Sequence, residues 1–152
     1  MSRDRALHFE DFEPGDRFES AGLTVSEALI LEFARFYDPQ LFHTDPEVAK
    51  AMVYGGLIAS GIQTIAITFK LFLETGTLAA CSLGSPGLDE IRWKIPVRPG
   101  DTLRVVAEVL EARASTSKPD RGIVRLLYTT FNQRGEVAMT MIGNQLCRRR
   151  PG

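Results

Sequence analysis

The chain has 152 residues, of which 44% are hydrophobic and 24% charged, and its formal net charge is -1. This length and balance are typical of one ordinary globular domain, predicted here over residues 1–152, and they exclude a disordered or fibrous chain. The near-neutral charge offers no basic surface for a phosphate backbone, so we expect no nucleic-acid partner.

The first twelve residues, MSRDRALHFEDF, contain no apolar run that could form the core of a signal peptide. No later segment is long and apolar enough to span a bilayer, so we expect a cytoplasmic protein that makes no membrane contact. Cys81 and Cys147 are interpreted as buried thiols, because disulfides are rare in that compartment. The only histidines are His8 and His43, and without close Cys/His spacing we expect no metal site.

The N-terminal half is predicted to be mainly helical. A short edge strand over Phe18–Val25 precedes a capping box at Thr24–Glu27, and apolar residues at helical spacing extend this first helix to Tyr37. Pro39 disfavours helical geometry at Asp38, so the helix is expected to end there in a polar loop.

Two more helices are predicted after that loop. Asp45 is the expected N-cap of a short one, with Pro46 at its first helical position. A long helix begins at Ser60 and ends near Gly76. Its buried face is predicted from apolar residues at helical spacing, namely Ile62, Ile65, Ala66, Phe69, Phe72 and Leu73.

The second half alternates β-branched and aromatic runs with Pro and Gly pairs, which predicts strands joined by turns. The expected strands are Cys81–Gly84, Leu88–Val97, Thr102–Ala112, Ile123–Asn132 and Glu136–Arg148. Helices followed by an antiparallel sheet indicate an α+β fold, in which the sheet curls around the long helix. One sheet face and an edge stay open, so we expect a homodimer that covers them.

Asp38 and His43 are the candidate acid-base groups, because they lie five positions apart in the loop after the first helix. Each also has a structural interpretation. An Asp between a helix and a proline often serves a turn, and a lone histidine beside Phe42 is often a hydrogen-bonded structural group. The spacing alone does not decide between the two.

Ser60 and Gly61 open the long helix, where they are either an N-cap and a close-packing glycine or part of an oxyanion site. Free N–H groups at a helix start bind developing negative charge, and glycine lets a substrate approach the backbone. Gly55–Gly56 is either an ordinary turn or part of the same site. The basic run Arg148–Arg150 is interpreted as a solvated tail, with phosphate recognition as the alternative.

These residues resemble a known family, the MaoC-like dehydratases or R-specific enoyl-CoA hydratases (hydratase 2), which have the hot dog fold. The stretch YDPQLFHTDP, Tyr37–Pro46, is similar to the family motif, with both acid-base candidates and the trailing Asp-Pro in register. Gly55–Thr64 resembles the family segment that enters the central helix, and Val97–Leu103 its strand-turn-strand signature. Tyr37, Gln40 and Leu41 replace the usual Gly, Asn and Pro, and Ser60 stands where many members have His.

The resemblance implies a six-stranded sheet around the helix Ser60–Glu74 and an acyl-CoA or related thioester substrate. It also implies reversible addition of water to a trans-2-enoyl thioester to give an R-3-hydroxyacyl thioester, with no cofactor. Asp38 and His43 would activate the water, the Gly61 N–H would stabilise the oxyanion, and Ser60, Gly56 and Gln40 would complete the substrate site. The alternatives are a hot dog thioesterase that hydrolyses the same thioester and a noncatalytic acyl-thioester-binding subunit.

Overall fold

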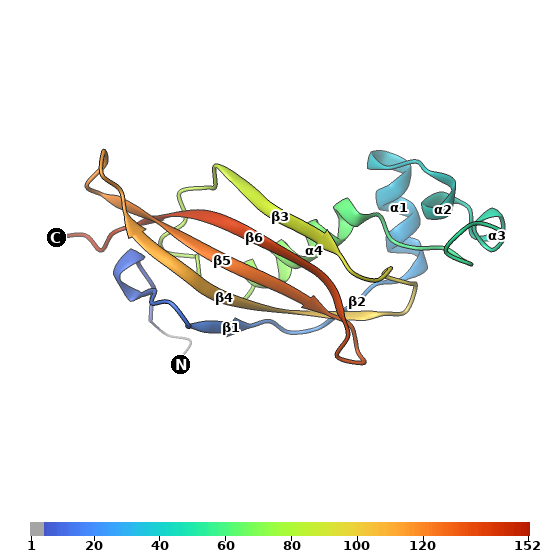
Figure 1. Ribbon diagram of the computed structural model, residues 1–152, viewed down its shortest axis with the longest axis horizontal. Coiled ribbons are helices and arrows are strands. Elements are labelled where there is room, and N and C mark those ends of the chain that lie inside the picture. The colour runs from blue at the N-terminus through green and yellow to red at the C-terminus, as the bar shows by residue number, and fades with distance from the viewer. Residues whose placement is uncertain (1–4) are drawn as a thin grey trace.

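The computed structural model describes residues 5–152, so the first four residues of the predicted domain lie outside the described part (Figure 1). The elements follow one another as η1 (Phe9–Asp11), β1 (Arg17–Glu19), β2 (Leu23–Thr24), α1 (Glu27–Tyr37), α2 (Leu41–Thr44), α3 (Pro46–Ala49), α4 (Gly61–Leu73), β3 (Gly87–Trp93), β4 (Thr102–Ala114), β5 (Arg121–Phe131) and β6 (Val137–Arg148). Helices therefore precede the main strands, as predicted.

The N-cap of helix α1 lies two residues after the predicted one. The Ser26 hydroxyl accepts a 3.1 Å hydrogen bond from the amide of Leu29, which makes Ser26 the N-cap. Thr24 belongs to β2 and its hydroxyl lies 2.7 Å from that of Thr102 on β4, so the prediction of Thr24 as the cap is wrong. The helix ends at Asp38, as expected before a proline.

The predicted polar loop after α1 contains a single helical turn, α2, which carries His43. Asp45 caps α3 as predicted, because its Oδ1 accepts hydrogen bonds from the amides of Glu47 at 3.1 Å and Val48 at 3.0 Å. His43 therefore lies in a short helical turn that the capped turn α3 follows directly.

Helix α4 begins after Ser60, as predicted, but of the six residues predicted for its buried face only Phe72 is buried. Ile62 is 53% exposed and Leu73 is 43% exposed. The buried side chains are Gln63, Thr64, Ile67, Thr68, Leu71 and Phe72. Thr68 fits inside because its hydroxyl lies 2.6 Å from that of Thr130 on β5, so two buried polar groups satisfy each other.

The six strands form one antiparallel sheet in the order β1-β4-β5-β6-β3, with β2 pairing with β4 at the side of β1. Alternate residues of β5 and β6 are buried against α4, which explains their period-2 pattern. The predicted strand Cys81–Gly84 is wrong, because only Ser82 forms a bridge, to Cys147. The thiols of Cys81 and Cys147 are free and buried, as predicted.

Figure 1 shows α4 lying behind the curved sheet, with α1, α2 and α3 gathered at one end of it and β3 along one edge. The other sheet face has no helix over it within the described residues. The α+β arrangement of a sheet around one long helix is therefore confirmed, and it places the predicted loop at an end of the sheet, where the helix begins. Within residues 5–152 no helix has the length and apolar character needed to cross a membrane.

Candidate active site

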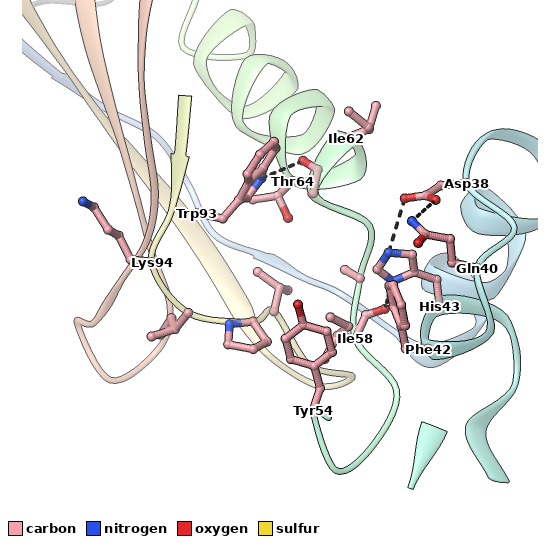
Figure 2. A pocket seen from close by; sticks show the side chains of 15 residues that line it. Asp38, Gln40, Phe42, His43, Tyr54, Ile58, Ile62, Thr64, Trp93 and Lys94 are labelled. Carbon is pink, nitrogen blue, oxygen red and sulfur yellow. Dashed lines mark hydrogen bonds and ion pairs between the residues drawn. The ribbon is translucent and has the colours of Figure 1, made fainter. Parts of the chain in front are cut away.

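A cavity of about 450 Å³ opens where α2, the chain that enters α4 and the end of β3 meet. Its lining is mainly apolar with a few converging polar groups, which is typical of a site for a small molecule. The lining residues are Asp38, Gln40, Phe42, His43, Tyr54, Ile58, Ala59, Gly61, Ile62, Thr64, Trp93, Lys94, Ile95, Pro96 and Val97 (Figure 2).

The carboxylate of Asp38 is held by three neighbours. Oδ1 accepts a 2.7 Å hydrogen bond from the Gln40 side-chain amide, and Oδ2 accepts one of 2.7 Å from the Ser60 hydroxyl. Oδ2 also lies 3.3 Å from Nε2 of His43. Partial burial alone would raise the pKa of Asp38, but the hydrogen bonds from Ser60 and Gln40, together with the charge that His43 carries when protonated, outweigh it and hold this pKa below its ordinary value. Asp38 is therefore ionised at neutral pH.

The imidazole of His43 is buried and its orientation is fixed. Nδ1 lies 2.7 Å from the carbonyl oxygen of Ile58. Because a carbonyl only accepts hydrogen bonds, Nδ1 must carry the proton, and in the neutral ring Nε2 then holds the free lone pair. This lone pair lies beside Oδ2 of Asp38 at the cavity wall. Figure 2 shows both contacts of the ring.

When the ring is neutral, two proton acceptors therefore lie side by side at the cavity, the Asp38 carboxylate and Nε2 of His43. A water molecule can donate one hydrogen to each, which orients its oxygen lone pair away from both. Such a pair can remove a proton from water and return one to a neighbouring carbon. The arrangement suits proton transfer coupled to attack by water.

The structure brings most of the predicted site residues together. Gln40 and Gly61 line the cavity, and Ser60, which is fully buried, reaches it through Asp38. The Gly61 N–H makes no hydrogen bond to any group of residues 5–152 and lies at the start of α4. Gly56 does not line the cavity, so its proposed place in the substrate site is not supported. Tyr37, which replaces the usual Gly of the family motif, is 73% exposed and lies outside the lining.

Sequence reasoning missed the wall formed by the last residue of β3 and the residues after it. Trp93, Lys94 and Ile95 line the cavity although they lie about 50 positions along the chain from the candidate loop. The indole Nε1 of Trp93 donates a 3.1 Å hydrogen bond to the carbonyl of Gly61. The available signal was that Trp93 is the single tryptophan of the chain and comes just before the recognised Val97–Leu103 segment.

Comparison with known proteins identifies the family. The family model described as "MaoC like domain" matches residues 11–130. Protein YdeM of Bacillus subtilis, whose function is uncharacterised, is 35% identical over 128 residues, which cover 84% of this chain and 89% of that protein. The crystal structure of a MaoC-like dehydratase from Rhodospirillum rubrum is 42% identical and has a TM-score of 0.89, covering 96% of this chain and 99% of that one.

The unliganded R-hydratase PhaJ1 from Pseudomonas aeruginosa is 22% identical, with a TM-score of 0.71, and covers 95% of this chain and 88% of its own. At that identity the similarity concerns the fold alone. The sheet curved around α4 is thus the hot dog fold, as the sequence predicts. The chain belongs to the family of MaoC-like dehydratase domains.

Proposed function

We propose that this protein adds water reversibly to a trans-2-enoyl thioester, with enoyl-CoA as the expected form, to give an R-3-hydroxyacyl thioester. The observation that carries the proposal is the distance of 3.3 Å between Oδ2 of Asp38 and Nε2 of His43. The other ring nitrogen of His43, Nδ1, is hydrogen-bonded to the Ile58 carbonyl. Family membership supports the same class of reaction.

In the forward direction the water bound between Asp38 and His43 attacks C3 of the enoyl group. One water proton passes to the pair, a C–O bond forms at C3, and the electrons of the double bond move toward the thioester oxygen. The pair then returns one proton to C2, so atoms and charge balance without any redox change. Ser60 and Gln40 orient Asp38 during both transfers.

The thioester oxygen gains negative charge when the enolate forms. The Gly61 N–H is the proposed donor to this oxygen, because it lies in the first turn of α4 and has no partner within the described residues. The dipole of a 13-residue helix adds to the stabilisation at that end. No metal or redox cofactor is needed for this chemistry.

We propose that residues 1–152 form one such domain and that it assembles as a homodimer. Strand β3 pairs with β6 on one side only and is the last strand of the sheet. Leu88 and Trp93 on this strand are 39% and 52% exposed, and Ile62 of α4 is 53% exposed. A second copy that pairs along β3 would cover the edge and these apolar groups. Light scattering should give twice the chain mass of 16.8 kDa.

The proposed function is tested with a panel of trans-2-enoyl-CoAs while enoyl absorbance and free thiol are followed together. A hydratase removes the conjugated double bond and keeps the thioester, so absorbance should fall without thiol release, and chiral analysis should give the R product. Thiol release in proportion to enzyme would favour the thioesterase instead. Tight binding of a thioester with neither signal would favour the noncatalytic subunit.

A further inference from the structure

Strand β3 contains an irregularity directly before the cavity. Asp89 lies opposite Ile142 of β6, but Arg92 lies opposite Thr140. Strand β3 therefore contains one more residue than β6 between these two pairs. Glu90 is in the extra segment and has a φ of 49°, the only positive φ of a non-glycine residue among residues 5–152. This is a β-bulge held in a backbone conformation that costs free energy, a combination that is common beside functional sites.

The bulge decides which way Trp93 points. Directly opposed residues of an antiparallel pair share a face, so Asp89 shares the outer face of the sheet with Ile142. Strict alternation from Asp89 would place residue 93 on that same outer face. Because one residue is inserted, Trp93 lies instead opposite Met139, which is fully buried on the face toward α4. The strained bulge thus turns the indole toward the helix.

There the indole closes against the first turn of α4. A Cβ added to Gly61 would lie 2.6 Å from Cε2 and 2.7 Å from Nε1 of Trp93, so only a glycine allows this contact. The Nε1–H bond to the Gly61 carbonyl fixes the ring. Figure 2 shows the ring beside the helix start, with Asp38 and His43 on the other side of the chain that enters the helix. The ring therefore occupies the space next to the proposed oxyanion donor.

The interior that continues along α4, beside this wall, is filled. Thr64, which lines the cavity, is 2% exposed, and one turn further along α4 the hydroxyl pair of Thr68 and Thr130 is completely buried. Tyr128 and Phe72 follow, with ring centroids 5.1 Å apart, and both are buried between helix and sheet. An acyl chain that enters past Gly61 therefore cannot continue along α4, and Trp93 closes the cavity on the side of β3.

We propose that Trp93, turned toward α4 by the bulge at Glu90, is the wall that limits the acyl group of the substrate to a short chain. This inference rests on the proposed function, because it takes the ligand to be an acyl thioester. Trp93 is a specificity-determining residue in this role: it contacts the acyl group and transfers no proton.

The test compares the wild type with Trp93→Ala. Hydration kcat/KM is measured for trans-2-enoyl-CoAs from four to twelve carbons, and dissociation constants are measured for the saturated acyl-CoAs of the same lengths. In the wild type, kcat/KM and affinity should both fall as the chain lengthens. Trp93→Ala should raise the ratio of long-chain to short-chain values at least tenfold. Arg92→Ala is the matched control, since Arg92 is the neighbour on the outer face, and it should leave the ratio unchanged.

Trp93 is also the single tryptophan, so its fluorescence reports directly on the site. Butanoyl-CoA should change the emission and free CoA should not.

If all chain lengths respond equally to Trp93→Ala while hydration persists, the inference is wrong and the proposed function stands. If no enoyl-CoA is hydrated but the ratio of long-chain to short-chain affinity shifts with Trp93→Ala, the role of Trp93 is supported and the proposed hydratase function is wrong. Absence of both binding and hydration overturns both. Light scattering must give the same mass for both variants and the wild type, and a ratio change that appears only with a changed mass contradicts the proposal.

Discussion

The Ser60 hydroxyl lies between the Asp38 carboxylate and the helix that it caps. It donates to Asp38 Oδ2 at 2.7 Å, while its oxygen accepts a 3.2 Å hydrogen bond from the amide of Ile62. One fully buried side chain therefore fixes both the start of α4 and the orientation of the proposed acid-base carboxylate. The Gly61 N–H follows directly after it, so the proposed oxyanion donor and the proposed base share this anchor.

Ser60→Ala is expected to affect stability and turnover together. Loss of an N-cap costs about 0.5–2 kcal/mol of unfolding free energy, which urea denaturation measures. Turnover should fall by roughly tenfold or more, since Asp38 loses one of its orienting hydrogen bonds. Ser60→Thr keeps the hydroxyl and should restore much of both. Full activity in a folded Ser60→Ala protein would show that this hydrogen bond does not matter for catalysis.

Gln40→Met tests the electrostatics of Asp38 and leaves Ser60, the N-cap of α4, in place. The Gln40 amide helps to hold the pKa of Asp38 below its ordinary value, and its removal destabilises the ionised form. The pKa of Asp38 should therefore rise, and the acidic limb of the kcat/KM profile, below which Asp38 is protonated, should move to higher pH. If the acidic limb stays at the same pH, Asp38 is not the group whose protonation causes it.

Asp38→Asn and His43→Gln should each lower turnover by about 10²- to 10⁴-fold, the usual contribution of a positioned acid-base group. Both replacements keep side chains of similar size, so circular dichroism should show an intact fold. The double variant should lose little more than either single one, because the two residues act as a unit. A residue whose replacement leaves hydration near normal does not have the proposed role.

Gly61→Ala should lower stability although alanine is the better helix former. The added methyl group would overlap Trp93, and such overpacking costs about 1–3 kcal/mol. In a double-mutant cycle, Trp93→Ala should remove most of that cost by clearing the contact. Equal costs of Gly61→Ala with and without the indole would mean that the contact carries no strain.

The bulge itself can be tested at Glu90. A non-glycine residue in this left-handed region costs roughly 1–2 kcal/mol, while glycine loses about 0.5–1 kcal/mol of chain entropy. Glu90→Gly should therefore stabilise the protein by roughly 0.5 kcal/mol, and Glu90→Val should destabilise it, because β-branched residues tolerate a positive φ poorly. Thermal unfolding of both variants gives the order directly, and the reverse order would contradict this assignment.

The sequence predicted the features that depend on local pattern. Pro39 correctly predicted the end of α1, and Asp45 correctly predicted the start of α3. The order of helices and strands followed from the periodicity of apolar residues. The buried face of α4 was predicted wrongly except at Phe72, because Gln63 and Thr68 are buried through hydrogen bonds to partners distant in sequence. A polar residue with a distant partner has no apolar signal in the sequence.

The candidate site divides in the same way. Asp38 and His43 lie in one short segment and could be selected as candidates because that segment resembles the family motif. The contribution of β3 could not, because it depends on a one-residue change of register at Glu90 that turns Trp93 to the inner face. The sequence GLDEIRW has no local preference that predicts a bulge, because the bulge arises from the way β3 pairs with β6.

The central claim is that Asp38 and His43 direct water to C3 of an enoyl thioester. Its most direct test is to incubate trans-2-butenoyl-CoA in oxygen-labelled water and to locate the label by mass spectrometry. The wild type should place it in the C3 hydroxyl of an intact thioester, and Asp38→Asn should place almost none there. Label in the carboxylate of a released acid, or no incorporation by the wild type, would contradict the claim.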